Sequence, residues 1–162
     1  MSGLDLGPAV LEVGPGYGMA TEVLRRQSPR IFSVEIDGRL SRLLGRRLAG
    51  SNAHVIQGDG TALPFPEAVF TGAVCFTMLH HVPSAALQDR LLAEVCRVLR
   101  PGAVFAGADS LWSRRMKWLH VRDTLVAIDP DTLGARLAAA GFVNIDIEVR
   151  APRSFRFRAR RP

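Results

Sequence analysis

The stretch LEVGPGYG, residues 11–18, places three glycines at alternate positions directly after a short apolar segment. Such a segment is typical of a buried strand, and the glycines allow a tight turn whose backbone can approach a ligand closely. A dinucleotide-binding fingerprint needs a further glycine at the sixth position of G-x-G-x-x-G. Counted from Gly14, that position is Met19, so the pattern is G-x-G-x-G and pyrophosphate binding is less favoured.

The rest of the chain alternates between strands and helices. Apolar runs predict strands over 9–13, 30–36, 53–57, 68–76, 103–109, 142–149 and 154–160. Periodic apolar positions and capping residues predict helices over 19–27, 39–49, 85–100 and 131–140. Strands separated by helices form a parallel sheet covered on both faces. We therefore expect a single α/β domain over residues 1–162: a three-layer sandwich around a mostly parallel, seven-stranded sheet with a C-terminal antiparallel hairpin.

Composition favours an ordinary globular domain, with 48% hydrophobic and 22% charged residues in 162. Cys75 and Cys96 lie inside apolar runs, and no metal-ligand spacing links them to the four histidines, so we expect buried thiols and no metal site. No apolar stretch is long enough to span a bilayer. The first residues, MSGLDLGPAV, lack the basic and apolar regions of a signal peptide, so we expect a cytoplasmic protein.

The net charge of +6 is concentrated at the end of the chain. Six arginines follow Glu148 and no acid follows them, whereas the remaining residues carry equal numbers of basic and acidic side chains. The segment SFRFRARR, residues 154–161, alternates aromatic or small residues with arginines, which is the period of a half-buried strand. A terminal strand with a solvated basic face is favoured, and a nucleic-acid-binding patch is the alternative.

Glu12 lies within the first predicted strand, which we expect to be central and covered on both faces. A carboxylate there is costly unless a cation or hydrogen-bond donors satisfy it. Next to a bound phosphate it would be repulsive. Glu12 therefore favours a ligand that carries an ammonium group.

Five motifs in order resemble those of the class I S-adenosylmethionine-dependent methyltransferases. LEVGPGYG resembles motif I, and four later stretches resemble the corresponding strand ends and turns: FSVEID (32–37), GDGTALPF (58–65), FTGAVCFTMLHHV (70–82) and RVLRPGAVF (97–105). The resemblance is to the small-molecule branch that includes the ubiquinone and menaquinone biosynthesis methyltransferases. It implies a Rossmann-like fold, S-adenosylmethionine as the cofactor and S-adenosylhomocysteine as its product.

The resemblance also implies which residues hold the cofactor: Glu12, Gly14, Gly16, Gly18, Glu35, Ile36, Asp59, Gly60, Phe76 and Thr77. The glycines let the backbone approach the methionine and ribose parts, and Glu12 faces the ammonium group directly or through water. Glu35 ends the second strand and accepts both ribose hydroxyls, whereas Asp37 is expected to cap the following helix. Asp59 accepts the adenine amino group, with a simple turn aspartate as the alternative.

His81 and His80 follow the fourth strand next to the expected methyl site and are the candidates for a catalytic base, with His81 favoured. Loop residues, one packed and one exposed, are the alternative. Residues 110–128 are expected to form an insertion that binds the substrate or closes over the cofactor as a lid. Only about eight residues precede the first strand, so the lid is expected to come from this segment, from a partner or from residues that the sequence has lost. Its candidate acceptor-binding residues are Trp112, Met116, Trp118 and His120. A surface helix is the alternative.

Three functions are compatible with these observations. The first is methyl transfer to a small-molecule acceptor through an oxygen or carbon nucleophile, because FTMLHHV stands where methyltransferases of amino or base nitrogens carry an NPPY-type sequence. The second is an RNA or protein methyltransferase that uses the arginine-rich C-terminal segment. The third is a non-catalytic Rossmann-like binding domain. As partners we expect a small-molecule acceptor, no membrane span, no nucleic acid, and a homodimer as the candidate assembly.

Overall fold

A computed structural model describes residues 5–111 and 126–162 of the chain. Its sheet has seven strands in the order β3-β2-β1-β4-β5-β7-β6. Their bounds are β1 (Ala9–Val13), β2 (Arg30–Glu35), β3 (Ala53–Gln57), β4 (Phe70–Phe76), β5 (Leu99–Ser110), β6 (Val143–Arg150) and β7 (Ser154–Arg160). Strands β1 to β5 pair in parallel, and β7 runs antiparallel to both β5 and β6. The predicted sheet and its C-terminal hairpin are confirmed.

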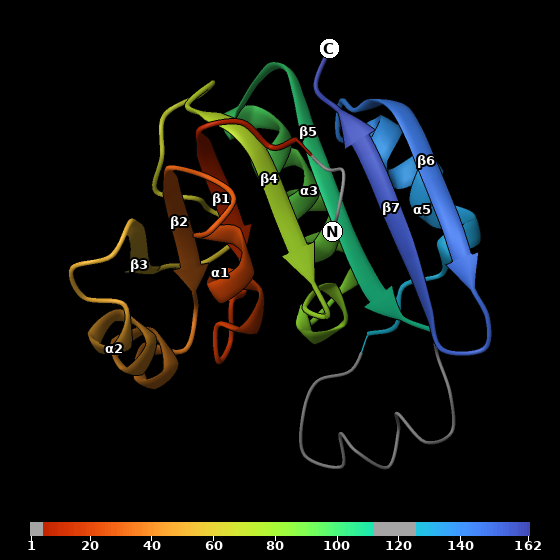
Figure 1. Ribbon diagram of the computed structural model, residues 1–162. Helices are drawn as coiled ribbons and strands as arrows, with labels where there is room; N and C mark the ends of the chain where they lie inside the picture. Colours follow the sequence, from red (N-terminus) through yellow and green to blue (C-terminus); the bar gives the residue numbers. More distant parts are fainter. Residues whose placement is uncertain (1–4, 112–125) are drawn as a thin grey trace.

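Helices cover the two faces of this sheet. They are α1 (Met19–Leu24), α2 (Gly38–Arg47), α3 (Ala85–Val98) and α5 (Pro130–Ala139), with a short 3₁₀ turn, η1 (Leu79–His81). Figure 1 shows α1 and α2 on the near side of the sheet and α3 and α5 on the far side. None of the helices formed by residues 5–111 and 126–162 has the length and apolar character that a membrane crossing needs.

The two faces of the sheet carry separate hydrophobic clusters. On one face, Leu24 of α1 and Leu44 of α2 pack with strand residues such as Val10 and Val74. On the other face, α3 and α5 pack against a larger cluster that includes Phe105. The predicted three-layer, Rossmann-like arrangement is therefore confirmed, and it leaves the carboxyl ends of β1, β2 and β4 at one edge.

The helices α3 and α1 are shorter than the sequence predicts. The helix expected over 85–100 ends at Val98, and Leu99 already has an extended backbone and begins β5. Pro101 explains this, because proline lacks a backbone N–H and disfavours the helical conformation in the residue before it. The helix expected over 19–27 ends at Leu24, and hydrogen-bonded turns continue the chain to Ser28.

The C-terminal segment is a half-buried strand, as its alternation predicts. Phe155 and Phe157 of β7 are buried in the cluster on the α3 and α5 face, whereas Arg156 and Arg158 are exposed. Phe157 pairs with Gly107 of β5, where an added Cβ would lie 2.4 Å from its ring. The missing side chain at that glycine makes room for the aromatic ring.

The exposed arginines of β7 lie opposite acidic residues of the neighbouring strand. Arg156 pairs in register with Glu148, and Arg158 pairs with Asp146. Opposite charges at directly facing positions on one sheet face attract each other. The charge of this face is therefore mixed rather than purely basic.

Truncation of Phe157 to alanine is expected to lower the free energy of unfolding by about 3–5 kcal/mol, as aromatic core truncations do. Replacing Arg156 and Arg158 together with glutamine should change it by less than about 1 kcal/mol, because these two side chains are exposed and exposed charges contribute little. Denaturant unfolding followed by circular dichroism measures both values. A small loss of stability in the phenylalanine variant, together with a large loss in the arginine variant, would contradict the burial of Phe157 in the core.

Candidate functional site

A cavity of about 470 Å³ opens at the carboxyl edge of the sheet. Turns that follow four different strands line it, including Gly14, Gly16, Glu35, Asp59, Gly60, Thr77 and His81. Loops at the carboxyl ends of parallel strands are where open α/β sheets bind ligands. Of the predicted cofactor residues, Ile36 also lines the cavity, whereas Glu12, Gly18 and Phe76 are not among its lining residues.

The three glycines of the first turn have different tasks. All adopt a left-handed backbone, with φ of 68° at Gly14, 54° at Gly16 and 76° at Gly18. A Cβ at Gly14 would lie 2.2 Å from the Met78 side chain, and one at Gly18 would lie 2.4 Å from Leu44. A Cβ at Gly16 would meet nothing within 4 Å. Gly14 and Gly18 therefore make room for neighbouring side chains, and Gly16 alone leaves open space for a ligand.

Glu35 joins the ends of β1 and β2. One carboxylate oxygen accepts a hydrogen bond from the backbone N–H of Gly16 at 2.9 Å, and the other accepts one from the N–H of Asp37 at 3.0 Å. The side chain is buried, with 6% of its surface exposed, yet it lines the cavity. Each carboxylate oxygen has a second lone pair. Glu35 is thus held in place with acceptor capacity left for the two ribose hydroxyls that the resemblance implies.

Asp37 lines the same cavity but caps α2. Its carboxylate accepts hydrogen bonds from the backbone N–H groups of Arg39 and Leu40, at 2.7 and 2.9 Å. These bonds hold the pKa of the Asp37 carboxyl below its ordinary value. The predicted capping role is present in the structure, and it occupies Asp37 Oδ1 with backbone hydrogen bonds.

The buried carboxylate of Glu12 is hydrogen-bonded by two hydroxyl groups. Its carboxylate accepts hydrogen bonds from Thr21 and Ser33, both at 2.7 Å. Burial raises the pKa of the Glu12 carboxyl, and the two hydroxyl bonds act in the opposite direction. The partners of Glu12 therefore belong to α1 and β2, and Glu12 braces the glycine turn from below.

The loop after β3 carries Asp59 and Gly60 to the cavity. Asp59 Oδ1 accepts the backbone N–H of Thr61 at 2.8 Å, so this carboxylate also shapes its own turn. A Cβ at Gly60 would lie 2.9 Å from both Leu91 and Val13, which shows how closely this loop lies on α3 and β1.

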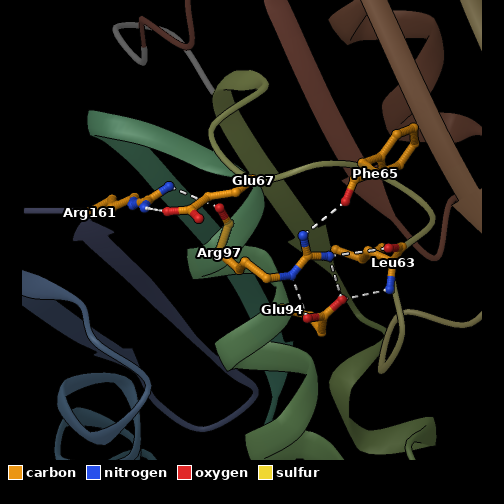
Figure 2. A network of polar contacts seen from close by, with 6 residues as sticks. All are labelled: Leu63, Phe65, Glu67, Glu94, Arg97 and Arg161. Carbon is orange, nitrogen blue, oxygen red and sulfur yellow. Dashed lines mark hydrogen bonds and ion pairs between the residues drawn. The ribbon is translucent and has the colours of Figure 1, made fainter.

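A partly buried ion pair holds that loop against α3 (Figure 2). The Arg97 guanidinium bonds both carboxylate oxygens of Glu94 at 2.7 and 2.8 Å and donates to the backbone carbonyls of Leu63 and Phe65. Glu94 in turn accepts the N–H of Leu63 at 2.9 Å. Arg161, from the end of the chain, extends this network to Glu67 at 2.6 Å. The wall of the cavity is thus fixed by side chains outside it.

The two histidines after β4 differ in their surroundings. His80 is buried, and its Nδ1 lies 2.5 Å from Oδ1 of Asp109 at the end of β5. His81 is exposed and lines the cavity, and its ring centroid is 4.1 Å from that of His80. Asp109 is a residue that the sequence reasoning missed, although its place as a carboxylate closing an apolar strand is a signal of the kind that drew attention to Glu35.

The predicted acceptor residues of the insertion, Trp112, Met116, Trp118 and His120, lie outside the described residues. Their role in binding an acceptor stays a prediction.

Comparison with known proteins assigns the chain to a family. Residues 11–107 match the family described as a methyltransferase domain, which is more than half of the chain. The chain belongs to this methyltransferase family. The match spans the glycine turn, Glu35 and the loop with Asp59. It confirms the predicted class I methyltransferase domain and S-adenosylmethionine as its cofactor, and it argues against a non-catalytic binding domain.

Two curated relatives of the methyltransferase domain are each named "Probable ribosomal RNA small subunit methyltransferase A". The protein from Thermococcus onnurineus is 37% identical over 67 residues, which are 41% of this chain and 24% of that protein. The protein from Pyrobaculum aerophilum is 35% identical over 112 residues, which are 63% of this chain and 46% of that protein. The chain therefore spans between about a quarter and about half of the length of these relatives.

A solved structure shares the fold across almost the whole chain. It contains a methyltransferase in complex with the Trm112 methyltransferase activator of Haloferax volcanii, has a TM-score of 0.80 and 15% identity, and matches 99% of this chain and 85% of that one. At this identity the similarity shows the fold alone.

These relatives overturn the predicted partners of the methyltransferase domain. A small-molecule acceptor and no nucleic acid are expected from the sequence, but the curated relatives are named as ribosomal RNA methyltransferases. The homodimer stays a prediction. The expectation of no nucleic acid is wrong because it relied on the strand-like alternation of the C-terminal segment and on the neutral balance of charge elsewhere, and neither shows how charge is distributed on the surface.

The variant Glu35→Gln is expected to weaken the binding of S-adenosylhomocysteine by about 1–3 kcal/mol, or roughly 5- to 150-fold. The amide has one acceptor oxygen instead of two, and its NH₂ group would face the N–H of Gly16 or Asp37. Calorimetric titration measures the loss. The matched control is Asp37→Asn, which keeps a good helix cap and should bind nearly as the parent does. Equal affinity of the Glu35 variant and the parent would contradict the assignment.

The variant Gly16→Val is expected to abolish the binding of S-adenosylhomocysteine in a domain that remains folded, because its side chain would project into the open space of the turn. The control is Gly50→Val. Gly50 also has a left-handed φ, 77°, and open space around its Cβ, but it does not line the cavity. Both variants carry the same kind of backbone strain. Equal cofactor affinity of the two variants would show that the turn is only structural.

Proposed function

We propose that this chain transfers the methyl group of S-adenosylmethionine to RNA, with His81 at the acceptor side of the cavity. The observation that carries the proposal is that one cavity brings together the acidic end of β2, the glycine turn and His81. The names of the curated relatives support RNA as the class of acceptor.

The residues present fit the cofactor. Gly16 leaves open space in the turn, and Glu35 presents a fixed carboxylate to the cavity. Asp59 and Gly60 would hold the adenine on the opposite wall, and Thr77 would lie near the methionine part. When bound, S-adenosylmethionine supplies a methyl carbon that its sulfonium already makes electrophilic. The chain must therefore orient the acceptor and exclude water, and orientation alone can supply roughly 7–11 kcal/mol of the barrier.

His81 is the residue that could remove a proton from the acceptor. A general base contributes only when the nucleophile starts protonated, as a ribose hydroxyl does. The ring of His81 packs against the ring of His80, and the hydrogen bond between His80 and Asp109 fixes His80. This chain of contacts would hold the imidazole of His81 at the cavity wall.

The test uses the full chain, S-adenosylmethionine labelled in its methyl group, and a small-subunit ribosomal RNA transcript. Label should appear in the RNA, and digestion to nucleosides identifies the methylated atom. His81→Gln should lower kcat by roughly 10²- to 10⁴-fold while cofactor affinity stays within a few-fold. The control is His54→Gln, since His54 is exposed on β3 and packs on Phe32 away from the cavity.

Two results would contradict the proposal. Cofactor binding without label in the RNA would exclude RNA as the acceptor class. Equal kcat for the His81 and His54 variants would exclude His81 as the base.

A further inference from the structure

The outer face of α2 carries a row of arginines. Arg39, Arg42 and Arg46 are exposed and follow one another at intervals of three and four residues. This spacing places them on one face of a helix, over about 10 Å of its length. The sequence of α2, GRLSRLLGRR, contains no acidic residue. We call these three arginines the α2 stripe.

Among the described residues, the α2 stripe forms no close ion pair. Within residues 5–111 and 126–162, none of its three guanidinium groups makes an ion pair or a side-chain hydrogen bond. The neighbouring Arg47 differs, since it donates to the carbonyl of Tyr17 and faces Glu22. The nearest acid in the sequence is Asp37, which attracts Arg39 and Arg42 electrostatically, although its carboxylate already accepts two backbone N–H groups.

The stability of the helix does not explain the α2 stripe. Basic side chains stabilise the last turn of a helix, where the dipole is negative, and Arg46 has that position. Arg39 lies in the first turn, where positive charge is unfavourable, and Arg42 lies in the middle of the helix, where the dipole has little effect. Helix stability thus explains Arg46 but not Arg39 or Arg42, and an exposed row of arginines without a close ion pair among the described residues is suited to an external anion.

The α2 stripe begins at the rim of the cavity. Asp37, the N-cap of α2, and Leu40 both line the cavity, and α2 packs against β3 and β2. Figure 1 shows α2 at the left-hand end of the sheet, next to β3. An extended anion that lies along α2 would therefore pass directly by the mouth of the site. The exposed arginines of β7 offer no equivalent surface, because Glu148 and Asp146 face them in register.

We infer that the α2 stripe is the surface on which the phosphate backbone of RNA docks, an inference that rests on the proposed function. Guanidinium groups bind phosphate oxygens in a bidentate manner. A row of about 10 Å is long enough to contact more than one phosphate of an extended strand. Phosphate binding of this kind positions RNA without reading its sequence.

The experiment measures binding of a fluorescent, mixed-sequence, single-stranded 20-nucleotide RNA as a function of salt concentration. The test variant replaces Arg39, Arg42 and Arg46 with glutamine, and the control variant replaces Arg156, Arg158 and Arg160 with glutamine. Each removes three positive charges from a different surface, and the control variant also loses the hydrogen bond from Arg160 to the Gly102 carbonyl. Because up to three phosphates would no longer be neutralised in the α2 variant, the slope of log K against log salt should become shallower by about 2. Its affinity should fall at least tenfold at low salt.

Three further measurements make the result decisive. Lysine at the three α2 positions keeps the charge and should restore most of the affinity, which separates charge from folding. Titration with S-adenosylhomocysteine should give the same affinity in both glutamine variants, which shows an intact site. Polyglutamate should compete far less well than unlabelled RNA, and equal competition would overturn RNA as the partner.

The failures of the two proposals are distinguishable. RNA binding that is abolished in the β7 variant and unchanged in the α2 variant would overturn the α2 stripe and leave RNA methylation standing. A parent chain that binds S-adenosylhomocysteine but shows no RNA binding at low salt would overturn both.

Discussion

The site depends on one carboxylate that two turns share. Glu35 ends β2, and its two oxygens accept the backbone N–H groups of Gly16, after β1, and of Asp37, at the start of α2. Without this bridge the left-handed glycine turn and the first residue of α2 would have no common anchor. The cavity between them would then lose the wall that is expected to hold the ribose. A buried carboxylate is stable there because hydrogen-bond donors satisfy both of its oxygens.

A second set of hydrogen bonds fixes the opposite wall. Arg97 and Glu94 hold the carbonyls and the N–H of the loop that follows Asp59 and Gly60, and Arg161 ties the end of the chain to the same region. Arg161, which follows β7, therefore supports this wall through hydrogen bonds to the Arg97 carbonyl and to Glu67. This gives one arginine of the C-terminal segment a structural role.

The order of strands and helices could be predicted because each strand is a compact apolar run and each helix has the matching period. Glu35 could be predicted because it closes a strand next to the glycine turn. The pairing of His80 with Asp109 could not, since the two residues are 29 positions apart and meet only once β4 and β5 are adjacent. The separate tasks of Gly14, Gly16 and Gly18 depend on Met78 and Leu44, whose positions are set by packing. The α2 stripe could not be predicted by counting basic and acidic residues. Its arginines are matched in number by acidic residues that lie elsewhere in the structure.

The central claim is that the cavity at the carboxyl edge of the sheet binds S-adenosylmethionine rather than a dinucleotide. The most direct measurement is a calorimetric titration of the full chain with S-adenosylhomocysteine, repeated with the nicotinamide dinucleotide NAD. The account predicts saturable binding of S-adenosylhomocysteine at one site per chain, competition by adenosine, and no detectable binding of the dinucleotide. A folded chain that binds NAD and not S-adenosylhomocysteine, or that binds neither, would contradict it.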